Sequence, residues 1–365
     1  MRIRIVPEVS IIIVNWNGGE VFKNCLTSLS KLKYKNWELI VVDNGSSDGS
    51  EKLAKKIILP TTNYRLLVNK VNLGFAPANN QAIKFAKGDY VLLLNNDTVV
   101  SPDLLDQLVS RMEKDKKLGV IQPKIFMMDP PSPKPTDGQA PPSPIVTEGQ
   151  GRISYLDNAG SFFTRIGFLE HWGFGQKDSK EFNKETKVFS CKGACMLVRK
   201  SVIDEIGLFD NDFVSYFEES DFCWRVWLAG WKVVYFPNAT IEHKVGFTIK
   251  RLDVVKINYD YYKNRIMSLI KNLELINLIY ILPIHLFISL GIAFVFFLRG
   301  QKNSAVMIID AIGYNIRNIK VTLEKRKIIQ QQRKVNDQFI FNNLSRKVDF
   351  NKFINDFRRV EKDME

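Results

Sequence analysis

The stretch YVLLLNNDTVVSPD, residues 90–103, joins an apolar strand to an abruptly polar end. It begins with the continuous apolar run that is typical of a strand buried on both faces. The run stops at three side chains that require water or a hydrogen-bonding partner, namely Asn95, Asn96 and Asp97. One interpretation is a turn before a helix that begins at SPDLLDQL, with Ser101 as its cap and Pro102 at its first position. The other is a ligand site at the end of a strand, which the flanking sequence favours.

Strand-like and helical segments alternate along the first part of the chain. The strands read VSIIIVNW (9–16), WELIVVDN (37–44), YRLLVN (64–69) and YVLLLNN (90–96), and helical spacing fills the intervals at 19–32, 47–57 and 76–88. This alternation predicts an α/β fold with a mostly parallel twisted sheet and helices on both faces. Ligands bind such sheets beyond the carboxyl ends of the strands, where the sequence places Asn15, Asp43 and Asp97.

The net charge of +13 favours acidic partners such as nucleic acid, anionic lipid or phosphorylated substrates. The basic residues concentrate around a later apolar stretch and in the tail, without the aromatic–basic face of a nucleic-acid module, so lipid is favoured. The four cysteines are too few for a disulfide framework in 365 residues, and we interpret them as core residues of a reducing compartment. The amino terminus lacks the features of a signal peptide, so we expect the catalytic part in the cytosol.

Two regions are expected, an α/β region at 1–250 and a helical region at 251–365. Within the first, DPPSPKPTDGQAPPSP (129–144) carries seven prolines and is expected to be a loop insertion. Within the second, LINLIYILPIHLFISLGIAFVFFL (275–298) has 24 residues without a formal charge, which is long enough for a membrane span. Its Pro283 and polar residues fit a pair of interfacial helices as well. Because basic residues flank this stretch, we expect association with anionic membrane lipid rather than a core helix.

The segment YFEESD gathers candidate catalytic acids. Glu218, Glu219 and Asp221 stand at an expected helix start, where the helix dipole alone favours acidic residues. The neighbouring aromatic residues form an apolar setting, which raises a carboxylate pKa and suits a general base. Elsewhere, Asp97 offers the hard oxygen ligand that Mg²⁺ or Mn²⁺ prefers, whereas Asp43 suits either a nucleotide contact or the cap of a turn.

Seven motifs follow one another in an order that resembles one known family. They read VSIIIVNWNG, ELIVVDNGSSDGS, NKVNLGFAPANNQAI, GDYVLLLNNDT, GACMLVRKSVIDEIGLFD, FEESDFCWRVWLAGWKVVYFPNATIEH and YYKNRIMSLIKN, and they cover residues 9–272. The chain resembles the family 2 glycosyltransferases, and most of all their rhamnosyltransferase and galactofuranosyltransferase branch. This resemblance implies the GT-A fold for residues 1–250, a nucleotide-sugar donor, a bound Mg²⁺ or Mn²⁺, and transfer with inversion.

The resemblance also implies roles for individual residues. Glu219 would be the base that deprotonates the acceptor, and Asp97 and His243 would hold the metal. The nucleotide pocket would be formed by Asp43, Asn72, Gly74, Asn80 and Asn96. Asp221 and Arg225 would contact the acceptor or maintain local structure.

Two departures from the family's pattern bear on the chemistry. Asn95 replaces the first acid of the family's Asp-x-Asp signature, which removes one charge near the metal and predicts weaker or relaxed metal dependence. Glu219 replaces the usual Asp, which keeps the carboxylate but places the acceptor slightly further away.

The sequence therefore predicts an inverting, metal-dependent enzyme that transfers one sugar, from dTDP-rhamnose or a UDP-sugar, to a hydroxyl of a glycan acceptor. We expect a lipid-linked acceptor in cell-surface polysaccharide or cell-wall assembly, at the cytoplasmic face of the membrane, with no nucleic-acid partner. A processive synthase is disfavoured because the chain has one apolar stretch and no Gln-x-x-Arg-Trp motif. The alternatives are an inactive nucleotide-sugar-binding or membrane scaffold protein, and a sugar nucleotidyltransferase, which would need a Gly-rich loop after the first strand.

Overall fold

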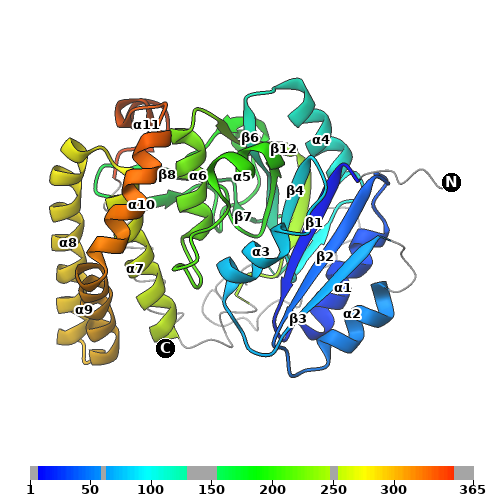
Figure 1. The fold of residues 1–365 in the computed structure, drawn as a ribbon, viewed down its shortest axis with the longest axis horizontal. Coiled ribbons are helices and arrows are strands. Elements are labelled where there is room, and N and C mark those ends of the chain that lie inside the picture. The colour runs from blue at the N-terminus through cyan, green and yellow to red at the C-terminus, as the bar shows by residue number, and fades with distance from the viewer. Residues whose placement is uncertain (1–6, 59–62, 130–153, 247–253, 349–365) are drawn as a thin grey trace, which may run out of the picture.

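A computed structural model describes residues 7–58, 63–129, 154–246 and 254–348 of the chain. A broad sheet occupies the centre, helices cover its faces, and a layer of helices lies at the end opposite the amino-terminal strands (Figure 1). Of the predicted Pro-rich insertion at 129–144, all but the first residue lies outside the described residues, as does the end of the basic tail.

The main sheet is mixed. Its order is β10-β12-β6-β11-β4-β1-β2-β3, in which β3, β2, β1 and β4 run parallel and β11 runs antiparallel between β4 and β6. This sheet, covered by helices, confirms the predicted α/β class. Its strands are β1 (Val9–Asn15), β2 (Trp37–Asn44), β3 (Tyr64–Asn69), β4 (Tyr90–Asn95), β5 (Thr98–Val100), β6 (Leu118–Met127), β7 (Leu156–Asn158), β10 (Thr186–Lys187), β11 (Cys195–Arg199) and β12 (Lys232–His243). A smaller sheet joins β13 (Ser345–Arg346), β8 (Ser161–Thr164) and β9 (Leu169–His171).

Helices pack on both faces of the main sheet. One face is covered by α1 (Gly19–Ser30), α2 (Ser50–Ile58) and α4 (Leu104–Lys114), and the other by α3 (Phe75–Ile83), α5 (Lys200–Ile206) and α6 (Glu218–Leu228). Successive side chains of β1 point to opposite faces of the sheet. Ile11 and Ile13 therefore pack with the first group of helices, and Ile12 packs with the second. Full burial of one such side chain stabilises the fold by about 1.5–3 kcal/mol. The central strands therefore read as continuous apolar runs. The four cysteines are free and buried, as expected of core residues.

The strand registers bring polar strand ends to one edge of the sheet. Asn15 lies opposite Asp43 in the ladder between β1 and β2, and β4 ends beside them at Asn95. The short β5 pairs with β12 and places Thr98 opposite His243. The turn between β4 and β5 thus reaches the edge that the sequence indicated.

That turn leads into a strand and not into a helix. The interpretation with Ser101 as a helix cap and Pro102 at the first position is wrong, because β5 first pairs with β12. The helix α4 begins at Leu104 with Asp103 at its N-cap. The carbonyl of Pro102 instead accepts a hydrogen bond from the backbone N–H of Lys33 at 2.8 Å.

The carboxyl-terminal helices form the layer at the far end of the molecule. They are α7 (Val254–Asn272), α8 (Leu275–Leu298), α9 (Lys302–Arg317), α10 (Ile319–Gln332) and α11 (Asp337–Asn343). α7 packs against α6, α9 and α10, and α8 packs against α7 and α9. The apolar stretch is one continuous helix with Pro283 inside it, and not the pair considered as an alternative. Within the described ranges, α8 is the helix that is long and apolar enough to cross a membrane.

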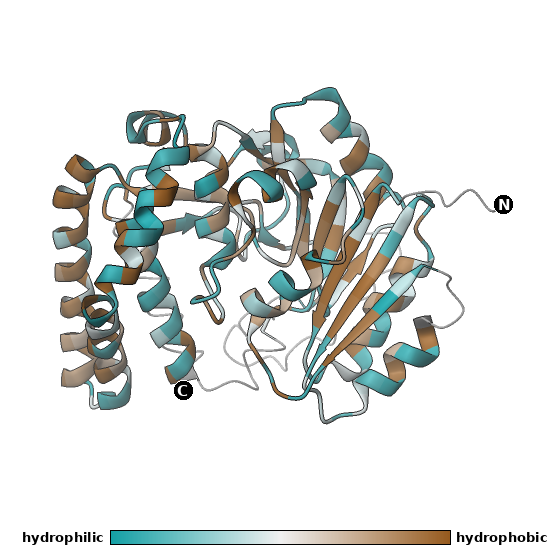
Figure 2. Ribbon diagram, in the orientation of Figure 1, coloured by the Kyte–Doolittle hydropathy of each residue, from teal (hydrophilic) through white to brown (hydrophobic). Residues whose placement is uncertain are grey.

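α8 has one buried side and one exposed side. The buried side carries His285, Ser289 and Ala293. The exposed side carries large apolar side chains on successive turns: Ile276, Ile279, Tyr280, Ile284, Phe287, Leu290, Phe294 and Phe297. Figure 2 shows these apolar turns along the outer edge of the molecule. Val306 and Ile309 of the adjacent α9 are exposed as well, so the two helices present an apolar surface that marks an interaction site.

Candidate active site

Three side chains from the ends of three strands form a hydrogen-bonded cluster at the edge of the sheet. Asn15 Nδ2 donates to Asp43 Oδ1 at 3.1 Å, and Asn96 Nδ2 donates to Asn15 Oδ1 at 2.8 Å. The second Asp43 oxygen accepts from the backbone N–H of Ser46 at 3.2 Å. Gly18 closes the cluster, since a Cβ there would lie 2.3 Å from Asn15 Oδ1. The side-chain amide of Asn15 thus joins Asp43 and Asn96, both of which were predicted to bind the nucleotide.

The other predicted nucleotide residues hold the loop after β3 against the segment before α6. Asn72 Oδ1 accepts from the backbone N–H of Gly74 at 2.9 Å. Gly74 has a φ of 92°, and a Cβ there would lie 2.5 Å from the carbonyl oxygen of Val214, so glycine is required. Asn80 Nδ2 donates to the carbonyl of Phe209 at 2.8 Å, and its Oδ1 accepts from the Phe209 N–H at 3.1 Å. In this structure, these residues fasten the loop through hydrogen bonds and close packing against protein groups.

His243 lies between two buried carboxylates. Its Nε2 is 3.2 Å from Asp97 Oδ1, and its Nδ1 is 2.8 Å from Asp157 Oδ2. Lys192 Nζ donates to the other oxygen of Asp157 at 2.7 Å. Burial alone would lower the pKa of His243, but the hydrogen bonds to Asp157 and Asp97 raise it to about 9. Burial would raise the pKa of Asp157, but Lys192 and His243 hold it below its usual range.

Glu219 occupies the first turn of α6, half-buried and beside Lys192. Burial raises the pKa of its carboxyl, while hydrogen bonds from nearby backbone N–H groups and the charge of Lys192 oppose that rise. Glu218 is buried, and burial together with the charge of Glu219 raises its pKa as well. A carboxylate whose pKa is raised is a stronger proton acceptor, as general-base catalysis requires.

The loop that leads into α6 is strained. Tyr216 and Phe217 have φ angles of 68° and 72°, in the left-handed region that costs a residue with a Cβ about 1–3 kcal/mol. Asn264 of α7 holds this conformation, because its Nδ2 donates to the carbonyls of Ser215 at 2.9 Å and Tyr216 at 2.7 Å. α7 thereby fixes the start of α6, and with it the position of Glu219.

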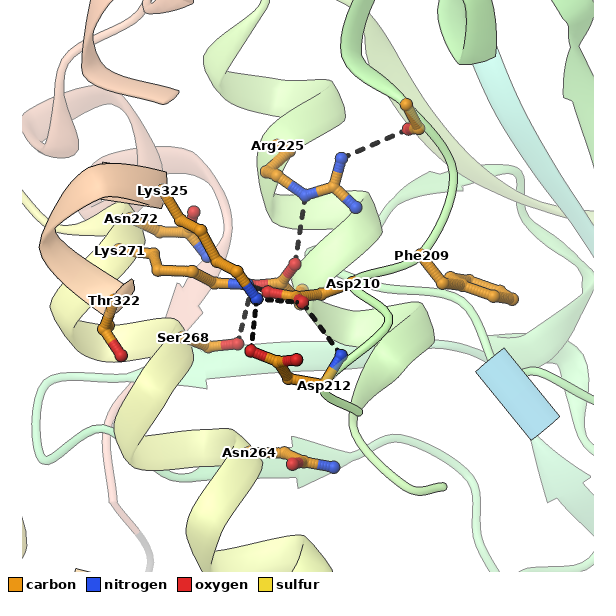
Figure 3. Close-up of polar contacts among 12 residues, drawn as sticks. Phe209, Asp210, Asp212, Arg225, Asn264, Ser268, Lys271, Asn272, Thr322 and Lys325 are labelled. Carbon is orange, nitrogen blue, oxygen red and sulfur yellow. Dashed lines mark hydrogen bonds and ion pairs between the residues drawn. The ribbon is translucent and has the colours of Figure 1, made fainter. Parts of the chain in front are cut away.

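Asp221 and Arg225 are hydrogen-bonded to each other within a buried polar cluster. The labelled residues of this cluster join α6, α7 and α10 (Figure 3). Arg225 Nε donates to Asp221 Oδ2 at 3.0 Å, and Asn272 Nδ2 donates to Asp221 Oδ1 at 2.9 Å. Lys271 Nζ lies 2.6 Å from Asp210 Oδ2 and 3.2 Å from Asp221 Oδ1. Two roles were considered for Asp221 and Arg225, namely contact with the acceptor and maintenance of local structure. The contacts described here are of the second kind.

Asp97 and His243 form a ligand set that fits a divalent cation. A carboxylate oxygen suits Mg²⁺ and Mn²⁺, and an imidazole nitrogen suits transition metals, so the pair favours Mn²⁺. Asp97 Oδ1 is buried and lies 3.2 Å from His243 Nε2, so the two candidate ligand atoms face each other. The described part of the chain has no group of three or more His, Cys, Asp or Glu that could hold a metal.

Two residues of this site, Asp157 and Lys192, were missed by reasoning from sequence. Asp157 stands in LDNAG, and Lys192 stands in CKGAC, a segment interpreted only as core. The available signal was a single charge within an apolar segment, because such a charge requires a partner when it is buried. The partners lie far away along the chain, so the sequence does not identify them.

Comparisons with known proteins identify the family of the chain. A family model described as Glycosyl transferase family 2 matches residues 10–207, which is more than half of the chain. A second model, Glycosyl transferase family group 2, matches residues 143–298.

Two curated relatives are about a quarter identical to the chain over the residues that align. An N-acetylglucosaminyl-diphospho-decaprenol L-rhamnosyltransferase from Mycobacterium tuberculosis (strain CDC 1551 / Oshkosh) is 27% identical over 244 residues, which cover 64% of this chain and 75% of that protein. A poly-beta-1,6-N-acetyl-D-glucosamine synthase from Staphylococcus aureus (strain COL) is 26% identical over 231 residues, which cover 63% of this chain and 48% of that protein. The chain thus matches about half the length of the synthase.

Solved structures show the shared fold. TarS residues 1–349 from S. aureus, in complex with UDP-GlcNAc, match with a TM-score of 0.54 at 16% identity, covering 89% of this chain and 87% of that one. The mannosyltransferase PcManGT from Pyrobaculum calidifontis, in complex with GDP-Man and Mn²⁺, matches with a TM-score of 0.51 at 14% identity, covering 90% of this chain and 85% of that one. These matches confirm the predicted GT-A fold. Together with the family model, they lead to one conclusion: the chain is a member of glycosyl transferase family 2.

Proposed function

We propose that the chain transfers a single sugar from a nucleotide-diphosphate sugar to a hydroxyl of a lipid-linked glycan acceptor, with Glu219 as the general base. The observation that carries this proposal is the position of Glu219, half-buried on the first turn of α6 and beside Lys192. Lys192 is linked through Asp157 and His243 to Asp97. The name of the mycobacterial relative supports a polyprenyl-linked acceptor and a rhamnose donor, and the TarS complex supports testing UDP-sugars.

The proposed reaction is a single displacement. Glu219 takes the proton of the acceptor hydroxyl as its oxygen attacks the anomeric carbon. The bond from that carbon to the nucleoside diphosphate breaks on the opposite side, and its electron pair leaves with the diphosphate, so the configuration inverts. The sugar passes through an oxocarbenium-like state, as it does in glycosidases. A base in this position contributes about 10²–10⁴-fold to the rate, and the charge of Lys192 helps to keep Glu219 ionised.

Asp97 and His243 would hold Mg²⁺ or Mn²⁺, and the bound cation supplies positive charge to the departing diphosphate. Because Asn95 carries an amide in place of an acid, one negative charge is missing near this pair, although Asp157 contacts His243 from its other side. Asp43 and Asn96 would contact the nucleotide, whereas the loop held by Asn72, Gly74 and Asn80 would form the wall of its pocket.

We further propose that the helical region 251–365 attaches the catalytic region 1–250 to the cytoplasmic face of the membrane. Because His285, Ser289 and Ala293 are buried on one side of α8, crossing the bilayer would separate them from their neighbours. α8 therefore lies in the plane of the interface, with its exposed apolar side toward the lipid.

A panel of nucleotide sugars, scored by nucleoside diphosphate release with Mn²⁺ or with EDTA, tests the proposed function. We expect release with one donor and its loss in EDTA. Glu219→Gln should lower kcat by about 10²–10⁴-fold with donor binding preserved, because only the proton acceptor is removed. The control is Glu205→Gln, which changes a carboxylate on α5 that pairs with Lys334.

A Glu219→Gln variant as fast as the wild type would show that another group is the base. If no donor is consumed, the chain is better described as an inactive nucleotide-sugar-binding protein.

A further inference from the structure

Arg265 of α7 is a buried cation enclosed by aromatic rings. Its side chain is only 2% exposed. The guanidinium carbon lies 4.0 Å from the ring centroid of Tyr261 and 4.4 Å from that of Phe168. The rings of Phe217 and Tyr262 lie at 5.8 Å and 5.6 Å. These four rings form an aromatic cage, whose cation–π attraction offsets part of the cost of burying the charge.

The described residues supply no anionic partner to Arg265. Its Nε and Nη1 are buried and make no hydrogen bond, and no carboxylate forms an ion pair with it in the described part of the chain. The other basic side chains that are equally buried there each have an acid: Lys124 with Asp178, Arg225 with Asp221, Lys263 with Asp260, and Lys271 with Asp210. An unpaired buried ion destabilises a protein. A bound anion would therefore stabilise Arg265 as the neighbouring acids stabilise the other buried basic side chains.

The aromatic cage lies between the candidate base and the apolar surface of α8. Phe217 stands two residues before Glu219, at the N-cap of α6. On the other side, the ring of Phe168 lies 4.5 Å from the ring of His285, which belongs to the buried side of α8. In a lipid-linked sugar, the phosphate groups connect the lipid to the sugar. With the sugar at Glu219 and the lipid at α8, those phosphates would fall near Arg265.

We propose that Arg265 binds the phosphate or diphosphate group that attaches the acceptor sugar to its lipid. This inference rests on the proposed function, since a lipid-linked acceptor is what brings a phosphate between Glu219 and α8. The donor carries the same chemistry in its diphosphate, but the donor pocket is proposed at Asp43 and Asn96, on the strand ends rather than on α7. Within the cage only Tyr261 is half-buried, whereas the other three rings are buried, so the anion reaches Arg265 past Tyr261.

Direct binding distinguishes the two sources of diphosphate. Isothermal titration calorimetry on the full chain in mild detergent would compare geranyl diphosphate, a short lipid diphosphate, with geraniol and with UDP. We expect Arg265→Met to weaken geranyl diphosphate binding at least about tenfold, because charge-assisted hydrogen bonds are lost, and to leave UDP binding unchanged. Arg265→Lys should retain part of the affinity, since the charge remains but the planar fork does not. The control is Arg317→Met, which removes an exposed charge on α9.

Thermal unfolding without ligand distinguishes an anion site from a purely structural cage. In phosphate-free buffer we expect Arg265→Met to melt at or above the wild-type temperature, because an unpaired buried charge is removed. A lower melting temperature of Arg265→Met, together with unchanged geranyl diphosphate affinity in the same variant, would overturn the proposal. So would loss of UDP binding in place of geranyl diphosphate binding, or equal binding of geranyl diphosphate and geraniol by the wild type. None of these measurements requires sugar transfer, so a failure of the proposed function in the donor panel is recognised separately.

Discussion

Lys192 is the residue that connects the candidate base to the proposed metal ligands. Its Nζ donates to Asp157, and its charge opposes the effect of burial on the pKa of Glu219. If that charge is removed, burial acts with less opposition and the pKa of Glu219 rises further. A general base works only when ionised, so activity is then lost at a higher pH as the solution is acidified.

We therefore expect Lys192→Gln to move the acid limb of the pH profile of kcat/KM to higher pH. Initial rates across the pH range measure this shift, and Lys187→Gln, an exposed position in β10, serves as the control. A profile that keeps its shape while the rate falls equally at every pH would mean that Lys192 contacts the substrate instead of tuning the base.

At the scale of elements, acids and lysines hold α7 and α10 to the loop before α6 (Figure 3). Asp210 lies between Lys271 at 2.6 Å and Lys325 of α10. Burial would raise the pKa of Asp210, but the two lysines outweigh burial and lower it in the folded state from its ordinary value of 3.8. A carboxyl shifted in this direction stabilises the fold above the unfolded-state pKa. That contribution is lost as the pH falls through the folded-state pKa.

Asp210→Asn should accordingly reduce the free energy of unfolding by about 3 kcal/mol at pH 7, since one partner of a buried ion pair is removed. The difference from the wild type should shrink progressively below about pH 4, because the carboxyl of the unfolded chain takes up a proton there while the folded one stays ionised. Urea unfolding at a series of pH values measures both effects. A difference that is the same at pH 7 and at pH 3 would contradict the ion-pair explanation.

At the scale of the whole molecule, the exposed side of α8 lies at the outer edge of the helical layer, away from the amino-terminal strands (Figures 1 and 2). Phe287 is 79% exposed on this side, so a charge there leaves the core unchanged and places an ion in the proposed lipid contact. We expect Phe287→Asp to weaken binding to anionic vesicles about tenfold or more, because the buried apolar area is lost and a carboxylate enters a negatively charged interface.

Vesicle co-sedimentation measures this effect, and Gln338→Asp adds the same charge at an exposed position of α11 as the control. Equal vesicle binding by the two variants would show that this side of α8 does not contact the membrane.

The sequence predicts the parts of this molecule that depend on local pattern. The strands at 37–44 and 64–69 have the predicted bounds, and their polar ends meet at one edge because parallel strands share a direction. The partnership of Asp157, Lys192 and His243 was not predicted, because it depends on the pairing of β7 and β12 with β6, which no local pattern encodes. The sequence also does not show which side of α8 is buried. Nearly all of its residues are apolar, and only packing in the folded protein decides which of them are covered.

The apolar side of α8 also determines which concentration of the proposed acceptor the enzyme would respond to. Because a membrane-bound enzyme and a lipid-linked acceptor would share one thin layer, their encounters would be two-dimensional, and the effective concentration of acceptor would follow its mole fraction among the lipids. Adding inert lipid at constant bulk acceptor would then slow the transfer by surface dilution. The nucleotide sugar, arriving from solution, would be insensitive to the same dilution.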